Sequence, residues 1–385
     1  MKKIAPLALT ALLLLTSCGR QSAVLPGIPD AVNGITLPSD PGYYDPGQGN
    51  GYNPNPNTPG FQPGNPQSQS PTYVSMSNVF LRMDPELGVT VKSLEGILKP
   101  KRAGDPVIFD DITSFVTQIS RAEMIIDEKN ITTLKNKYTF NFPDSPIKDV
   151  SISFLPGRLR MSGKLKQVVW VPFSMEGTIS PTADGKLKLV PDDIRTAGIP
   201  VKSLLKFIGL TTSKLISISS ERGLTFAGND VLLDPSLLFP PPRVEGRIVA
   251  AEITQGQMRI VFAGGQPNPR RALPDPGAPN YMHVYGGNVL IMNELQYGAE
   301  MQMVDMRPES DFDFYMQNYR QQLQAGYVKV VNDKGTLITL MPDYKDINNN
   351  SGVWDGYPGG KPNLRPYQSP AGQRQTGQLS HNPYQ

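Results

Sequence analysis

The chain has 385 residues, enough for one large domain or two ordinary ones with tails. Its 36 Gly and 38 Pro residues concentrate towards both ends, so these ends are not expected to form packed core. Without Lys2 and Lys3 the formal net charge falls from +3 to +1, too little for the basic surface that nucleic-acid binding requires. A single Cys excludes a disulfide framework or a thiolate zinc cluster, and with two His residues no metal or other cofactor is expected.

The first 18 residues combine a basic start, an apolar run and the only cysteine. The run Ile4–Leu15 is too short to span a bilayer but suits a signal peptide. It ends in Leu15-Thr16-Ser17-Cys18-Gly19, which resembles the lipobox of bacterial lipoproteins. The resemblance implies a signal peptide over 1–17 and a Cys18 that carries a diacylglyceryl thioether and usually an N-acyl chain such as palmitate. An ordinary signal peptide followed by a chance cysteine is the alternative.

Lipidation at Cys18 predicts where the protein resides. Two or more acyl chains give stable membrane anchoring, whereas one chain is marginal. Gly19 stands where an Asp would favour retention in the inner membrane. The lipobox resemblance therefore implies a protein of the cell envelope, anchored through Cys18 at the periplasmic face of the outer membrane.

Two segments have the composition of disordered chain. Residues 18–72 are rich in Pro, Gly and Asn and lack a hydrophobic period, so we expect a tether behind Cys18. Residues 346–385 predict a second disordered tail. Between them, 73–345 is expected to be a β-rich domain with a core over 150–262 and a C-terminal extension over 281–345.

Period-two alternation marks the strands of this domain. Leu159 and Met161 alternate with Arg158 and Arg160, and the same pattern runs through 169–176 and 186–189. Two hairpins are expected, from 244–253 with 258–262 and from 328–331 with 336–340. The pattern predicts an α+β, β-rich fold in which a long curved antiparallel sheet packs on a few short helices.

Helices are expected in five short segments. The clearest is 200–209, in which Val201, Leu204, Leu205 and Ile208 fall on one face. Weaker candidates are 110–119 and 130–138, with Asp or Asn as caps. One capped turn is expected over 234–239 and a helix over 311–325. In this reading Asp110-Asp111 is a helix cap in preference to an acid–base pair.

The stretch 150–262 resembles the tubular lipid-binding fold of the LmeA-like phospholipid-binding proteins of the bacterial envelope. The resemblance is carried by paired strands over 150–154 and 159–165, by 171–177 and 185–189, by the helix at Pro200, and by the segment 232–246. The segments from Tyr281 to Tyr344 are similar to uncharacterised secreted relatives of that group. The resemblance implies a sheet wrapped on a long helix with an apolar slot for acyl chains; the short helices of this chain depart from it.

The apolar faces of these strands and of the 200–209 helix supply the candidate lipid-binding residues. They are Phe154, Leu159, Met161, Phe173, Leu204, Leu205 and Ile208. Arg158 and Arg160 are candidates for holding a phosphate headgroup at the mouth of the slot. The alternative for both arginines is an ordinary solvated strand face.

Catalytic motifs are not found, so no enzyme is expected. The sequence has no G-x-S-x-G, H-E-x-x-H, P-loop or Rossmann pattern. His283 is expected to be packed in the core or to lie at the surface, and a catalytic role is the alternative. The leading hypothesis is a membrane-anchored lipoprotein that binds or shuttles phospholipid or another acyl lipid non-covalently. The alternative is a scaffolding lipoprotein that binds peptidoglycan or an envelope protein complex. A hydrolase ranks third.

Overall fold

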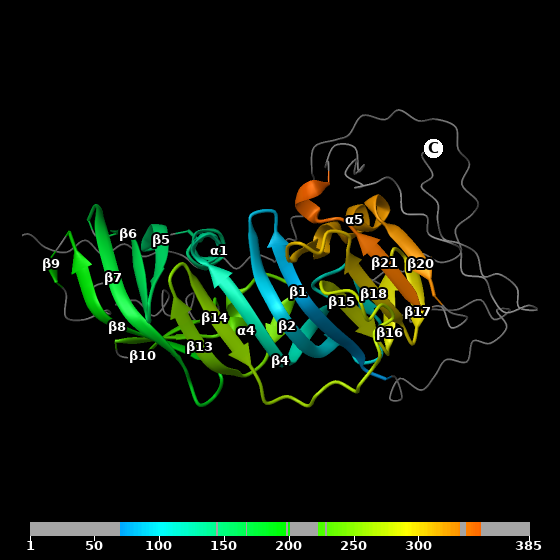
Figure 1. Ribbon diagram of the computed structural model, residues 1–385. Coiled ribbons are helices and arrows are strands. Elements are labelled where there is room, and N and C mark those ends of the chain that lie inside the picture. The colour runs from blue at the N-terminus through cyan, green and yellow to red at the C-terminus, as the bar shows by residue number, and fades with distance from the viewer. Residues whose placement is uncertain are drawn as a thin grey trace, which may run out of the picture. The chain divides into compact units, whose positions relative to one another are not determined.

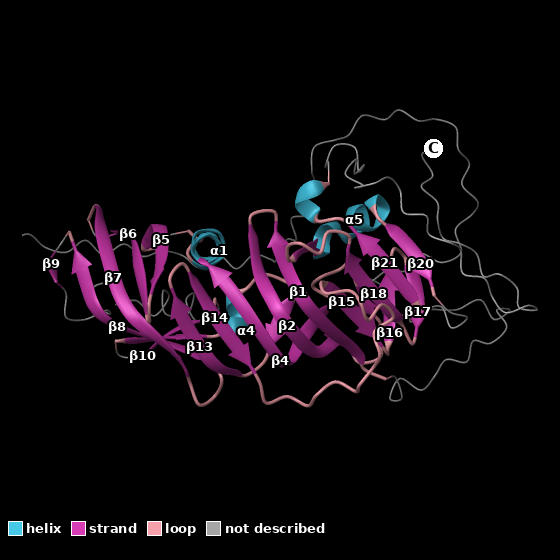
Figure 2. Cartoon of the chain, in the orientation of Figure 1, coloured by secondary structure: helices cyan, strands magenta, loops and turns pink. Residues whose placement is uncertain are grey.

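The computed structural model describes residues 70–143, 145–166, 168–197, 199–200, 222–227, 229–331 and 336–347. Strands make up most of these residues, and the helices between them are short (Figure 2). The coarse prediction of a β-rich fold with large antiparallel sheets is therefore confirmed. None of the helices in these ranges has the length and apolar character needed to cross a bilayer.

Sheet 1 is the largest sheet of the described residues, with eleven strands. They are β1 (Thr72–Asp84), β2 (Leu87–Pro100), β4 (Phe115–Asp127), β12 (Arg243–Glu245), β13 (Ile248–Thr254), β14 (Gln257–Phe262), β15 (Tyr281–Tyr285), β18 (Glu300–Asp305), β19 (Phe312–Tyr315), β20 (Tyr327–Val330) and β21 (Leu337–Met341). The main path runs β13-β14-β4-β2-β1-β15-β18-β21-β20, with β12 beside β4 and β19 beside β1. β1 therefore lies inside the sheet, between β2 and β15 (Figure 1).

Sheet 2 contains seven strands within the described residues, and the small sheet 3 contains three. Sheet 2 comprises β5 (Ile147–Leu155), β6 (Arg158–Lys166), β7 (Trp170–Pro181), β8 (Leu187–Thr196), β9 (Ile199–Pro200), β10 (Leu224–Ala227) and β11 (Asp230–Leu233). Sheet 3 comprises β3 (Val107–Ile108), β16 (Asn288–Ile291) and β17 (Glu294–Tyr297). The described residues of sheets 1 and 2 are joined near their turns by three backbone hydrogen bonds: Gly157 N–H to Ile253 O (2.9 Å), Gly256 N–H to Phe154 O (3.1 Å) and Ile248 N–H to Gly185 O (3.0 Å).

The helical elements are single turns or little more. They are α1 (Glu128–Leu134), the π-helical turn η2 (Lys135–Thr139), α4 (Pro235–Leu238), the 3₁₀ turns η3 (Met316–Asn318) and η4 (Tyr344–Asp346), and α5 (Tyr319–Ala325). The expected capped turn at 234–239 is confirmed as α4, where the Asp234 carboxylate accepts a hydrogen bond from Ser236 N–H (3.0 Å).

The expected helix over 110–119 is wrong, and the one expected over 311–325 is confirmed only in its second part. Residues 110–119 form a turn and then the start of β4, in which Phe115, Thr117 and Ile119 are buried alternately. Asp111 caps a turn and not a helix: its carboxylate accepts a hydrogen bond from Thr113 N–H (2.8 Å). The segment 311–325 begins with β19, whose four residues are all buried, and becomes helical only at Met316. The expected amphipathic helix at 200–209 lies almost entirely outside the described residues.

The two expected hairpins are present with adjusted ends. β13 pairs antiparallel with β14, while Val244 belongs to the separate strand β12 beside β4. β20 and β21 pair antiparallel, as expected for 328–331 and 336–340. Most of the buried apolar side chains of sheets 1 and 2 belong to one continuous core, and the candidate site lies within it.

Candidate functional site: an apolar cavity between two sheets

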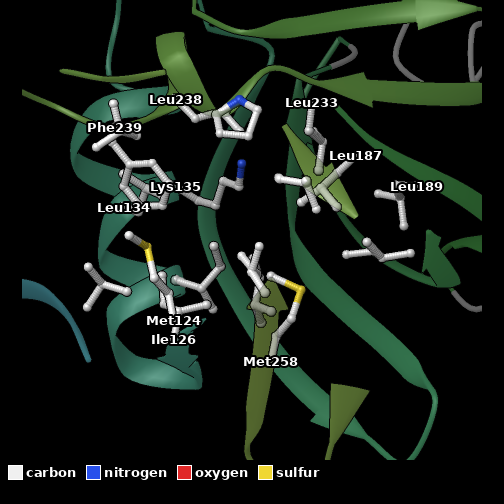
Figure 3. A pocket seen from close by; sticks show the side chains of 18 of the residues that line it. Met124, Ile126, Leu134, Lys135, Leu187, Leu189, Leu233, Leu238, Phe239 and Met258 are labelled. Atoms are coloured by element: carbon white, nitrogen blue, oxygen red, sulfur yellow. The ribbon is translucent and has the colours of Figure 1, made fainter. Parts of the chain in front are cut away.

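The core between sheets 1 and 2 contains a cavity lined by apolar side chains. Its walls come from β1, β2, β4, β13 and β14 on one side and from β5 to β8, β10 and β11 on the other, with α1 and α4 contributing at the ends. Figure 3 shows Met124, Ile126 and Met258 of sheet 1 and Leu187 and Leu189 of sheet 2 around the same space. Among the described residues that line it, only Thr117 and Lys135 are polar.

The size of the cavity decides what fits inside. The space open to the centre of a water molecule is about 130 Å³. That volume lies below the range of about 300–1,000 Å³ typical of pockets for drug-sized ligands, and close to the about 150 Å³ of an engineered apolar cavity that binds benzene. The cavity therefore has room for part of one alkyl chain and not for two chains side by side.

An empty apolar cavity of this size is costly, because its lining atoms lose dispersion contacts that a filled core would provide. Water gains little by entering, since a buried water needs two to four polar partners and the walls offer almost none. The site therefore favours an apolar occupant.

A side-chain ladder holds the helical segment that closes one end of the cavity. Glu128, Thr132 and Asn136 follow one another at intervals of four residues and bond to alternate residues of the edge strand β5. The Glu128 carboxylate accepts a hydrogen bond from Phe154 N–H (2.6 Å), and the Thr132 hydroxyl oxygen accepts one from Ile152 N–H (3.0 Å).

Asn136 completes this ladder at the π-helical turn. Its side chain accepts a hydrogen bond from Val150 N–H (2.9 Å) and donates one to Val150 C=O (2.6 Å). The exposed backbone edge of sheet 2 is thereby satisfied by side chains where a further strand would otherwise pair. The other face of α1 is consequently fixed towards the cavity, to which it contributes Ile131 and Leu134.

Lys135 is the charged residue of the described cavity wall, and the sequence analysis did not identify it. It begins η2, and its carbonyl accepts the hydrogen bond of Phe140 N–H (2.8 Å), five residues later. The residue is 8 % exposed, and burial lowers the pKa of its amine to about 8. Ile131, Leu134 and Lys135 have the i, i+3, i+4 spacing of a single helix face, and this spacing was the available signal.

The lipid-binding residues predicted from the sequence fall into three groups. Leu159 and Met161 line the cavity. Phe154 and Phe173 are buried in the surrounding core and are not part of the cavity wall. Leu204, Leu205 and Ile208 lie outside the described residues.

Arg158 and Arg160 lie on the opposite face of β6 and do not line the cavity. Arg160 pairs with Glu176 (2.7 Å), and Arg158 pairs with Asp192 (2.5 Å) and with Glu176 (3.4 Å). A headgroup would have to compete with these acids, so the role predicted for the two arginines stays a prediction without support from the geometry.

His283 lies in β15, whose residues take no part in the cavity wall. The ring is 1 % exposed and stacks on Tyr285 at 4.7 Å, and burial lowers the pKa of the imidazole to about 4. It is therefore a packed, neutral histidine at pH 7.

Asp110 likewise serves a structural contact. Its carboxylate accepts hydrogen bonds from the Tyr319 hydroxyl (2.7 Å) and from the Arg320 guanidinium (2.5 Å). Within the ranges that the structure covers, no group of three or more His, Cys, Asp or Glu side chains is arranged to hold a metal ion.

Comparison of the chain with protein-family models, with curated proteins and with solved structures finds no match. The resemblance to the LmeA-like proteins therefore stays a prediction.

Proposed function

We propose that this protein binds an acyl lipid non-covalently, with one alkyl chain in the cavity between sheets 1 and 2. The observation that carries the proposal is an apolar cavity of about 130 Å³ whose described walls contain only two polar residues. Burying alkyl chain there is favourable by about 0.8 kcal/mol per methylene, and the lining side chains regain the contacts that an empty cavity lacks.

An exposed apolar tip, formed by Val168, Val169, Trp170 and Ile199, supports contact with a bilayer. These side chains lie where β6 meets β7 and at β9, and Val168 is fully exposed. Lys148, Lys164 and Lys166 are exposed beside them, and the Lys148 amine lies 4.4 Å from the centre of the Trp170 ring. Apolar and aromatic side chains next to lysines suit the interface of an anionic membrane.

The lipidated Cys18 and the tether over 18–72 complete the proposal. An acylated Cys18 would hold the domain within reach of a membrane, and the tip would contact that surface while a lipid enters or leaves the cavity. The process moves lipid without making or breaking covalent bonds, so no catalytic residue is proposed.

The test uses the full chain with Cys18→Ser, so that no attached acyl chain competes for the cavity. After delipidation, titration with the neutral fluorophore N-phenyl-1-naphthylamine should show saturable uptake of one molecule per chain. Met161→Trp, which fills the cavity, should weaken this uptake at least tenfold. Ser162→Trp, the neighbouring position on the other face of β6, should leave uptake unchanged.

Native mass spectrometry of protein purified from cells provides a second readout, in which a bound lipid is expected to give an added mass that extraction removes. If the wild-type chain takes up neither the fluorophore nor lipid, the cavity is not a binding site, and the scaffolding alternative becomes the better hypothesis.

A further inference from the structure

We infer that the cavity selects a single-chain lipid with an anionic head, whose carboxylate or phosphate pairs with Lys135 inside the protein. This inference rests on the proposed function and specifies its ligand. It is drawn from the placement of one lysine in a wall that is otherwise apolar, and it differs from the surface arginines suggested by the sequence.

The position of Lys135 is unusual for a cation. Its side chain extends into the cavity, and Figure 3 shows the nitrogen directed into the space between Leu134 and Phe239 on one side and Leu187 and Leu233 on the other. Lysines near an apolar surface ordinarily extend their amines to water, whereas here the whole residue is 92 % buried.

No acid of the described residues neutralises this amine. The structure gives Lys135 neither an ion pair nor a side-chain hydrogen bond there, and burial alone accounts for the lowered pKa. The neighbouring Lys137, two residues later, does have acidic partners: its amine pairs with Asp84 (3.0 Å) and Glu86 (3.1 Å). At a pKa of about 8 the amine is still largely protonated at neutral pH, so the cavity contains a positive charge without a counter-charge.

The local backbone supports a specific role for this residue. Lys135 opens a π-helical turn, a rare conformation that occurs frequently at functional sites. A buried unpaired charge is strongly unfavourable, and a ligand anion in hydrogen-bond contact with the amine removes that penalty. The cavity of about 130 Å³ is too small for two chains side by side, so the ligand that satisfies both the wall and the amine has one alkyl chain and one anionic head.

The experiment compares ligands that share a twelve-carbon chain and differ only in the head. Dodecanoate, monododecyl phosphate, 1-dodecanol and dodecyltrimethylammonium each displace N-phenyl-1-naphthylamine from the delipidated full chain carrying Cys18→Ser. We expect the better of the two anions to bind about tenfold to a hundredfold more tightly than the alcohol, and the cation to bind most weakly. The order of the two anions tells whether a carboxylate or a phosphate is the natural head.

Lys135→Met keeps the volume of the side chain and removes the charge, so it should bind the alcohol as well as before and lose the preference for anions. Lys129→Met is the matched control, because Lys129 is exposed on the adjoining helix α1 and this variant should keep that preference.

Two results would overturn the inference. One is equal binding of anion and alcohol by the wild-type chain, and the other is an unchanged preference in Lys135→Met. Both leave the proposed function standing, since the alcohol still binds. Failure of the fluorophore and of all four ligands would instead reject the proposed function itself.

Discussion

At the scale of single residues, Lys135 couples the stability of the ligand-free protein to pH. The pKa of its amine is about 8 in the folded chain and near 10.5 in the unfolded chain. At pH 7 the amine is protonated in both states, so folding carries the full free-energy cost of burying its charge. Between these two pKa values the unfolded chain binds more protons, and stability therefore rises with pH across this window. We expect Lys135→Met to raise the free energy of unfolding at pH 7 by about 3 kcal/mol, since one pKa unit equals about 1.4 kcal/mol.

Urea unfolding of delipidated protein at pH 7 and at steps up to pH 10.5 measures this difference. The gap between the wild type and Lys135→Met should shrink as pH rises, while Lys129→Met should follow the wild type throughout. Thr117 is the only other polar residue of the described cavity wall. Tyr138, whose pKa burial raises to about 12, is present in all three proteins, so it does not affect the difference between them. A gap independent of pH would mean that the amine is not desolvated in the folded protein.

At the scale of elements, the β6–β7 connection and β9 present the apolar tip to solvent. Val168→Ser with Val169→Ser removes two exposed apolar side chains and should reduce binding to vesicles of phosphatidylcholine and phosphatidylglycerol at least tenfold. Co-sedimentation at low and high salt gives the measurement, and salt should weaken the remaining binding through the neighbouring lysines. Val249→Ser, at an exposed apolar position on β13, is the control. Equal binding by all three proteins would exclude the tip as a membrane contact.

The elements also show what the sequence could predict. Alternation placed Leu159 and Met161 on one face of β6 and Arg158 and Arg160 on the other, as the structure confirms. The prediction of a helix over 110–119 was wrong. Apolar residues there satisfy a helical spacing and a strand spacing together, and partners in sheet 1 decide between them. Lys135 was missed because a lysine beside an apolar stripe ordinarily reaches solvent, and only the packing of α4 and sheet 2 around it prevents this.

At the scale of the whole described unit, one buried ion pair connects its beginning to its end. The Arg82 guanidinium of β1 donates hydrogen bonds to both carboxylate oxygens of Asp313 in β19 (2.5 and 2.9 Å). The backbone N–H of Asp313 in turn donates a hydrogen bond to the carboxylate of Asp343, which lies near the last described residues (2.8 Å). The Asp313 side chain is 3 % exposed. No pattern in the sequence joins residues this far apart, so this contact could not be predicted.

Arg82→Met leaves Asp313 buried without its partner and should lower the free energy of unfolding by about 3–5 kcal/mol. Lys92→Met is a suitable control, because the pair of Lys92 with Asp311 (2.8 Å) is partly exposed and its loss should cost less than about 1 kcal/mol. Urea unfolding at pH 7 compares the two. Similar small effects for both would show that the buried pair does not hold the two ends together.

The interior place of β1 in sheet 1 has a mechanical consequence. Any force that pulls on the chain through its N-terminal segment reaches β1 first, and β1 is held on one side by β2 and on the other by β15 and β19. Detaching β1 therefore requires breaking its hydrogen bonds to strands on both sides, whereas an edge strand has partners on one side only. A domain suspended from Cys18 would therefore be attached through an interior strand of its sheet. Because Met76, Leu81 and Met83 of that strand line the cavity, a pull along residues 18–72 would act directly on the cavity wall.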